Sequence, residues 1–357
     1  MTPVEFRTSI LTSFYTAMHQ VVPDNFDHAR FANMGPTLPK TFQLPIHVSY
    51  MGFFLDNYEN LARASALLVD EASRHTFSRI ILYRLLGHHH VAVREGFSWP
   101  EELATLTAAH GYSTGASELK IRGEEGSLHH FEGVPCDGGT IKLDCWVSNV
   151  AYTALKRQYY AMHGNVAIGP KPGNFVIDAG ACFGDTTVHF AKSVGPTGHV
   201  FSFDPMPVHG NAVRHNVNQN GLTDRVTYVD KAVGDETNDV SNDAAFSTTK
   251  ANPSFSLRSA GAGVPITTID NFCQTGRVPR IDFIKMDIEG HELAALRGAR
   301  STIAAHRPVL AISLYHRKQD LYEIPLWLEQ NFPFYEYYLD HYSMHQQETV
   351  LFAVPRA

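Results

Sequence analysis

VIDAGACFGDTT, at residues 176–187, joins an apolar run to a glycine-rich turn and then to a stretch with helical character. The run ends in the pattern DxGxxxG, in which Gly180 permits a sharp turn and the close approach of a ligand. Gly184 lets the following helix pack near the strand. In open parallel sheets, ligands bind in the crevice outside the carboxyl ends of the strands. The stretch therefore predicts the first strand and the ligand-binding turn of an α/β sheet.

Strand-like and helical patterns alternate after this turn. Apolar runs occupy 175–178, 200–204, 226–229, 281–286 and 309–314, and helical patterns occupy 184–193, 206–220, 291–305 and 320–331. Near-continuous apolar strands that alternate with helices indicate a parallel sheet covered on both faces. Two last runs, at 335–339 and 349–354, predict an antiparallel pair at the sheet edge.

The N-terminal part of the chain has a different character. Helices are predicted near 4–20, from an N-cap at Asp56 to a stop at Gly87 with a break near Ser73, at 100–110 and at 151–163. A turn signal at 136–139 predicts a β-hairpin, and the polar segment 234–263 predicts a surface excursion. We expect a mainly helical region with a hairpin over 1–150, which either covers a pocket or forms a homodimer. A catalytic domain is expected over 151–357.

Composition restricts the class of protein. The 357 residues are 44% hydrophobic and 18% charged, with a formal net charge of −7. Lys and Arg do not cluster, so no nucleic-acid partner is expected. No apolar run reaches the length of about 18 residues that a membrane span needs. The four cysteines form no CxxC pair, which favours a reduced, cytoplasmic protein.

The turn and the second strand indicate the kind of ligand. The spacing differs from the GxGxxG that holds a pyrophosphate, and an Asp in the turn suits a cationic ligand. The second strand ends in FDP at 203–205, where Asp204 could accept both hydroxyls of a ribose. The alternative is an N-cap, with Asp204 accepting from an amide of the next helix. The third strand leads into Lys231 and Ala232, where an adenine edge would lie.

The chain resembles the FkbM-like family of S-adenosylmethionine (SAM)-dependent methyltransferases. The carrying segments are VIDAGACFGDTT (176–187), FDP (203–205), FIKMDIEGHE (283–292) and ETVLFA (348–353), and the resemblance covers about 155–355. It implies a Rossmann-like, seven-stranded class I methyltransferase sheet and O-methylation of a small molecule, such as a sugar or secondary metabolite. The family more often has Glu where Asp204 stands, and the shorter carboxylate still reaches a ribose.

The resemblance and the turn together give a set of expected cofactor contacts. They are Asp178, Gly180, Ala181, Phe183, Gly184, Asp185, Thr186, Asp204, Pro205, Lys231, Ala232 and Asp287. SAM is the expected cofactor, and no metal is expected.

Candidate catalytic residues follow successive strands at one edge of the predicted sheet. Asp287 and Glu289 follow the fourth strand, His316 follows the fifth, and His341 ends the next. Imidazole titrates near neutral pH, so His316 or His341 is expected to take the acceptor's proton while a carboxylate orients the acceptor or the imidazole. The competing mechanism places a divalent cation on Asp287 and Glu289, where it lowers the pKa of the acceptor hydroxyl.

Two other functions compete with methyl transfer. A nicotinamide-dependent oxidoreductase could use a related sheet, although the DxGxxxG spacing and the antiparallel C-terminal pair argue against it. A SAM-binding scaffold without catalysis would keep the same turn.

Overall fold

A computed structural model describes residues 1–28, 40–94, 98–238 and 263–356. The main sheet has seven strands in the order β10-β9-β8-β13-β14-β16-β15. Their bounds are β8 Phe175–Ala179, β9 His199–Phe203, β10 Val226–Val229, β13 Phe283–Met286, β14 Val309–Ser313, β15 Tyr335–His341 and β16 Thr349–Pro355. The pairs from β10 to β14 are parallel, and β15 pairs antiparallel with β16. The predicted fold class and the predicted final pair are confirmed.

The chain divides into two compact units. One consists of residues 1–105 and 314–357, and the other of residues 106–313. We describe each unit by itself. The domain organisation expected from the sequence, with a boundary at residue 150, stays a prediction.

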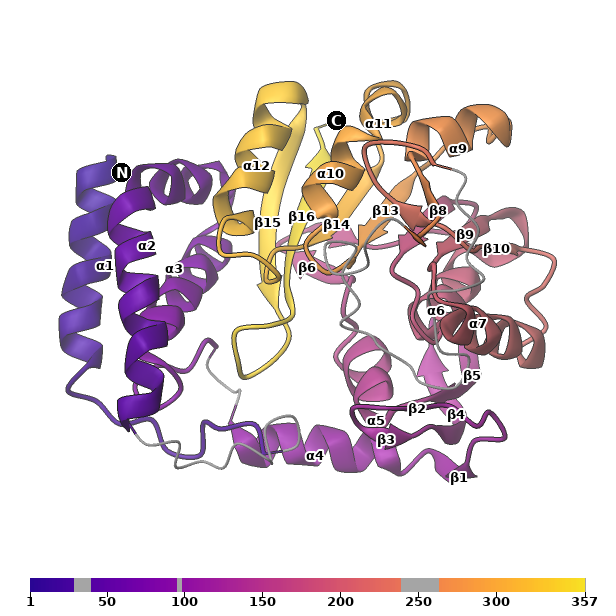
Figure 1. Cartoon of the computed structure of the whole chain (residues 1–357), viewed down its shortest axis with the longest axis horizontal. Helices are drawn as coiled ribbons and strands as arrows, with labels where there is room; N and C mark the ends of the chain where they lie inside the picture. Colours follow the sequence, from indigo (N-terminus) through magenta and orange to yellow (C-terminus); the bar gives the residue numbers. More distant parts are fainter. Residues whose placement is uncertain (29–39, 95–97, 239–262, 357) are drawn as a thin grey trace. The chain divides into compact units, whose positions relative to one another are not determined.

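In the unit of residues 106–313, the parallel strands are held by apolar side chains. All four residues of β13 are buried, as are the last four of β8 and of β9. The helices of this part are α6 Asp185–Val194, α7 Pro207–Gln219, α9 Ile269–Thr275, α10 Glu292–Arg297 and α11 Arg300–His306 (Figure 1). The prediction of one helix over 291–305 is wrong, because the helix is interrupted at Gly298. A Cβ there would lie 2.0 Å from the carbonyl oxygen of Gly234.

Short strands and turns precede the parallel sheet in this unit. Their bounds are β1 Ser113–Ala116, β2 Arg122–Gly123, β3 Gly126–Ser127, β4 His129–Cys136, β5 Gly139–Cys145, β6 Ala161–His163, β7 Val166–Ile168, α5 Val147–Asn149 and a π-helix Val150–Leu155, and later β11 Ala232–Val233 and β12 Ile266–Thr267. The predicted hairpin is confirmed, since β4 and β5 pair antiparallel.

The helix predicted over 151–163 is wrong in its second half. Helical backbone ends at Leu155, and 161–163 is a strand. Arg157 and Tyr159 separate the two with positive φ values of 54° and 71°, which a helix cannot accommodate.

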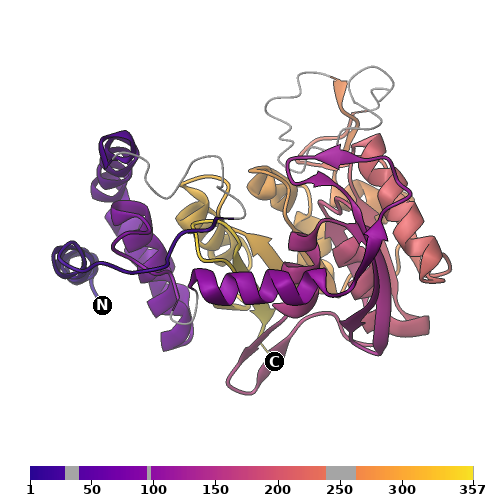
Figure 2. The ribbon, with the colours of Figure 1, turned by 90° about the horizontal axis from the view of Figure 1, so that it is seen from below.

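The unit of residues 1–105 and 314–357 contains three helices from the first part of the chain and one from the last. They are α1 Pro3–Ala17, α2 Lys40–Leu67, α3 Glu71–Leu86 and α12 Asp320–Asn331. Helices α1, α2 and α3 pack on one another (Figure 2). The helix expected over 100–110 is α4 (Trp99–His110), and the stop at Gly87 is also confirmed.

The helix start predicted at Asp56 is wrong. Asp56 lies inside α2, and Phe54, two residues before it, is a buried residue of the same helix. Helical structure is interrupted between Leu67 and Glu71 because the connecting residues pair with β15. The amide of Val69 donates to the carbonyl of Tyr337 at 3.0 Å, and Asp70 caps α3 by accepting from the amide of Ser73 at 2.7 Å.

We expect Asp70→Ala to lower the free energy of unfolding by about 1 kcal/mol, because the first turn of α3 loses its cap. Asp56→Ala is the matched control. This side chain is exposed in a helix interior, so alanine should leave stability unchanged or raise it by a few tenths of a kcal/mol, about the difference in helix propensity. Urea unfolding followed by circular dichroism measures both. Equal effects of the two substitutions would contradict the assignment of Asp70 as the cap.

Most of the polar segment 234–263 lies outside the described residues. No helix within 1–28, 40–94, 98–238 and 263–356 combines the length and the apolar character that crossing a membrane requires.

Candidate functional site

The glycine turn after β8 is tied by its backbone to two neighbouring strands. The amides of Gly180 and Ala181 both donate to the carbonyl of Phe203 at the end of β9, at 3.0 and 3.1 Å. On the other side, a Cβ built on Gly180 would lie 1.9 Å from the carbonyl oxygen of Asp287. The group that closely approaches Gly180 is therefore the backbone after β13. We expected a ligand there.

Gly184 serves helix packing. It has a φ of 82° at the start of α6, and a Cβ there would meet the Cα of Val213 in α7 at 3.0 Å. The expected close packing exists, with α7 as the partner instead of the strand.

Asp178 ends up inside the protein. Its side chain has no exposed surface, and one oxygen accepts from the hydroxyls of Thr186 at 2.8 Å and Thr187 at 2.6 Å. The other oxygen lies 3.2 Å from the ammonium of Lys285. Thr187 also bonds to Ser202 of β9 at 2.8 Å. This network connects the first turn of α6 to three strands.

Asp185 is also an interior group. It is 4% exposed and accepts from the hydroxyl of Thr153 in the π-helix at 2.5 Å. Burial raises the pKa of the Asp185 carboxyl above its ordinary value. Ala181 and Phe183 are buried as well, and the ring of Trp146 meets that of Phe183 at 5.0 Å, edge to face. The buried side chains of Asp185, Ala181 and Phe183 therefore support the glycine turn from the interior of the protein.

Asp204 connects the glycine turn to α7. One carboxylate oxygen accepts from the amide of Cys182 in the turn and from Nδ1 of His209, each at 3.0 Å. The other accepts at 2.9 Å from the amide of Met206, the N-cap of α7. The N-cap alternative is not confirmed, because Met206 is the N-cap of α7 and no side chain caps this helix. Asp204 instead links the turn to the residue that precedes α7. Pro205 follows it and is partly exposed.

Sequence reasoning missed His209. It lies in the first turn of α7, and its place five residues after Asp204 was the signal that the sequence offered.

Lys231 and Ala232 follow β10. Ala232 is buried in β11 and pairs with Ile266, whereas Lys231 is partly exposed.

Asp287 and Glu289 lie in the turn after β13. Asp287 is partly exposed, its amide donates to the carbonyl of Ala179 at 3.1 Å, and its carboxylate accepts from the hydroxyl of Tyr159 at 2.7 Å. Glu289 is partly exposed and has a φ of 55°. The buried Glu292 accepts from the amide of Ile288 at 2.9 Å and closes this turn. Tyr159 was missed because its segment was interpreted as a helix.

The two candidate histidines belong to the other unit and have different surroundings. His341 in β15 has no exposed surface, and Nδ1 lies 2.9 Å from the hydroxyl of Thr349. Nε2 lies 3.4 Å from the hydroxyl of Ser343. His316 is partly exposed and its ring lies 4.1 Å from that of Tyr315.

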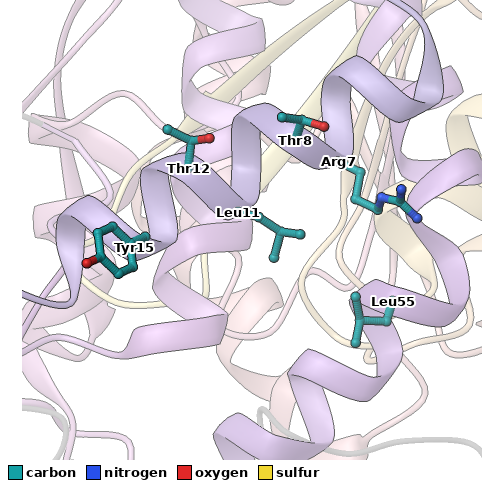
Figure 3. Close-up of a pocket in the computed structure, with 6 residues that line it drawn as sticks. All are labelled: Arg7, Thr8, Leu11, Thr12, Tyr15 and Leu55. Carbon is teal, nitrogen blue, oxygen red and sulfur yellow. The ribbon is translucent and has the colours of Figure 1, made fainter.

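A pocket of about 500 Å³ lies on the helices of this same unit (Figure 3). Five of its lining residues come from α1, and Leu55 comes from α2: Arg7, Thr8, Leu11, Thr12, Tyr15 and Leu55. It holds no carboxylate or imidazole, the groups that would move a proton. The glycine turn is taken as the candidate site because it lies at the carboxyl ends of β8 and β9, the edge of an open α/β sheet at which ligands bind.

Residues 178–337 match the model of the methyltransferase FkbM domain. No curated protein matches the chain. Among solved structures, it is similar to the methyltransferase FkbM from Methylobacillus flagellatus KT, with 19% identity over 85% of this chain and a TM-score of 0.53. The match spans 60% of that protein's length.

Two more distant similarities are to smaller proteins. One is an O-methyltransferase from Bacillus cereus, solved in complex with SAH (S-adenosylhomocysteine). It is 15% identical, the match covers 51% of this chain and 74% of that chain, and the TM-score is 0.34. The other is a methyltransferase from Geobacter sulfurreducens, at 15% identity, 52% of this chain, 72% of that chain and a TM-score of 0.33.

Proposed function

We propose that the protein transfers a methyl group from SAM to a hydroxyl of a small molecule. The support is the match of residues 178–337 to the model of the methyltransferase FkbM domain and the seven-stranded α/β sheet of the chain. A sugar or a secondary metabolite is the expected class of acceptor. A cytoplasmic location, a role in secondary metabolism and a homodimer stay predictions from the sequence.

The observation that carries the proposal is the bond between Asp204 and the glycine turn. A carboxylate has about four lone-pair sites. Three are used by Cys182, Met206 and His209, which leaves acceptor capacity at the carboxyl end of β9. Ligands of open α/β sheets bind at this edge, and an acidic residue here accepts from ribose. We propose that Asp204 holds the ribose of SAM while the turn receives the amino-acid tail.

The interior side chains have a supporting role in this proposal. Asp178, Asp185 and Thr186 are bonded to groups of the protein itself, so we propose that they hold the turn from inside rather than contact SAM. Lys231 and Ala232 remain the proposed neighbours of the adenine.

Methyl transfer needs the acceptor aligned and its proton removed. Asp287 suits the alignment, because the hydroxyl of Tyr159 holds its carboxylate at the end of β13. The assignment of the proton to His316 stays a proposal from the sequence, as does the alternative in which a divalent cation binds Asp287 and Glu289. General-base assistance is typically worth about 10²–10⁴-fold in rate.

Titration calorimetry tests the cofactor. We expect SAM and S-adenosylhomocysteine (SAH) to bind and NAD not to bind. Asp204→Ala and Asp204→Asn should each weaken SAH binding by about 1.5–3 kcal/mol, the contribution of hydrogen bonds to a charged group. Asp204→Asn keeps an oxygen for the amide of Met206, so it separates ribose binding from the loss of the bond to Met206.

Asp224→Ala is the matched control, because Asp224 is 63% exposed and pairs with the adjacent Arg225. It should leave binding unchanged. Binding of NAD without SAM would make the protein an oxidoreductase instead. Wild-type SAH affinity in Asp204→Asn would restrict Asp204 to a structural role, in which it links the glycine turn to Met206.

A further inference from the structure

Lys285 is a charged residue in the middle of an otherwise apolar strand. It is 2% exposed, and its neighbours Phe283, Ile284 and Met286 in β13 are fully or almost fully buried. Burial of an isolated ammonium is very costly, so such a group must be paired. The groups that pair with this ammonium therefore indicate its role.

The ammonium donates hydrogen bonds to two carbonyls at the end of β8 and forms an ion pair with the carboxylate of Asp178. Nζ lies 2.7 Å from the carbonyl oxygen of Gly180, 3.2 Å from that of Ala179 and 3.2 Å from a carboxylate oxygen of Asp178. Burial lowers the pKa of Lys285, but the charges of Asp178 and Asp287 raise it more, and the net direction is upward. The side chain therefore stays an ammonium at neutral pH.

The carbonyl of Gly180 lies beyond the regular pairing of the sheet. The β8–β13 register ends at Ala179 opposite Met286, and Gly180 has a φ of 83°. The direction of its carbonyl is thus set by the contact with Lys285. Tyr159 closes the other side: its ring lies 5.2 Å from Nζ, and its hydroxyl donates to Asp287. Tyr159 has a φ of 71°, a backbone conformation that costs energy in a tyrosine.

We infer that Lys285 is a positioning residue, whose ammonium holds the carbonyls of Ala179 and Gly180 and so fixes the glycine turn in the shape that receives the cofactor. The inference rests on the proposed function, because it requires that the turn bind SAM. When the turn is ordered before the cofactor arrives, binding does not include the free-energy cost of ordering the turn. The affinity for SAM is therefore higher. Lys285 acts through the backbone and does not need to touch the ligand.

The test measures SAH affinity by calorimetry and thermal stability on the same samples. Lys285→Met keeps an unbranched side chain, one atom shorter than lysine, and removes the charge and the donors. It should weaken SAH binding about 10- to 100-fold, the loss expected when hydrogen bonds to a charged group are removed. Asp270→Ala is the matched control. Asp270 likewise has three hydrogen bonds in the same unit, from the amides of Ser301 and Thr302 and the hydroxyl of Thr302. It should lower the melting temperature and leave SAH affinity within about twofold.

A second comparison covers the case in which Lys285→Met does not fold. The double variant Lys285→Met/Asp178→Asn removes both charges of the buried pair, which restores folding if the uncompensated carboxylate is the cause. Compared with the single variant Asp178→Asn, the double variant should still bind SAH about tenfold or more weakly. A role limited to neutralising Asp178 would instead give the two variants equal affinity.

Equal affinity in that comparison, or SAH binding by folded Lys285→Met within about threefold of wild type, would overturn the inference. An equal loss of affinity in Asp270→Ala would also overturn it, because general destabilisation would then explain the effect. Failure of the wild-type protein to bind SAH would instead overturn the proposed function.

Discussion

Replacing Gly180 with alanine is expected to lower the free energy of unfolding by about 2–5 kcal/mol. The left-handed φ of 83° costs an L-residue about 1–2 kcal/mol. The new Cβ would lie 1.9 Å from the carbonyl oxygen of Asp287, and overpacking of a buried site costs about 1–3 kcal/mol or more. The obstacle is backbone, so it cannot move aside as a flexible side chain would. Urea unfolding followed by circular dichroism measures the loss.

Gly195→Ala is the matched control for this prediction. Gly195 has a similar φ of 66°, but a Cβ there would meet nothing within 4 Å. We expect it to show only the conformational cost of about 1–2 kcal/mol. Equal losses for Gly180→Ala and Gly195→Ala would mean that Asp287 does not approach Gly180 as described.

His341→Ala is expected to lower the free energy of unfolding by about 2–4 kcal/mol. The imidazole has no exposed surface, so its removal leaves a cavity in β15. It also leaves the buried hydroxyls of Thr349 and Ser343 without the ring nitrogens they now contact. Urea unfolding measures the effect. These surroundings favour a structural role for His341 over the catalytic role that its place at a strand end suggested.

His316→Ala is the comparison, because this histidine is partly exposed. It should cost about 1 kcal/mol, the typical effect of a point substitution and less than the loss expected for His341→Ala. A His341→Ala variant as stable as wild type would contradict the structural role. In that case both histidines would again be equal candidates for the proton acceptor, to be compared by the rate of a single methyl transfer.

The sequence by itself determined the class of fold and the position of the glycine turn after the first strand of the sheet. Apolar runs such as 175–178 and 281–286 are typical of strands that are buried on both faces. A parallel sheet with helices on both sides provides that burial. The glycine turn and Asp204 could also be located, because a sharp turn after a strand needs glycine whatever surrounds it. These features depend on residues that are close together in the chain.

Only the tertiary structure decided which groups meet at the turn. The carbonyl of Asp287 lies against Gly180, and the ammonium of Lys285 donates to the carbonyl of Gly180. The hydroxyl of Tyr159 donates to the carboxylate of Asp287. These residues are far apart in the sequence, except for Lys285 and Asp287. The same holds for the break between α2 and α3, which follows from pairing with Tyr337 and moved the helix cap from Asp56 to Asp70. Local propensity cannot show such contacts, because a buried amide, carbonyl or ammonium is satisfied by whichever partner the fold brings within hydrogen-bond distance.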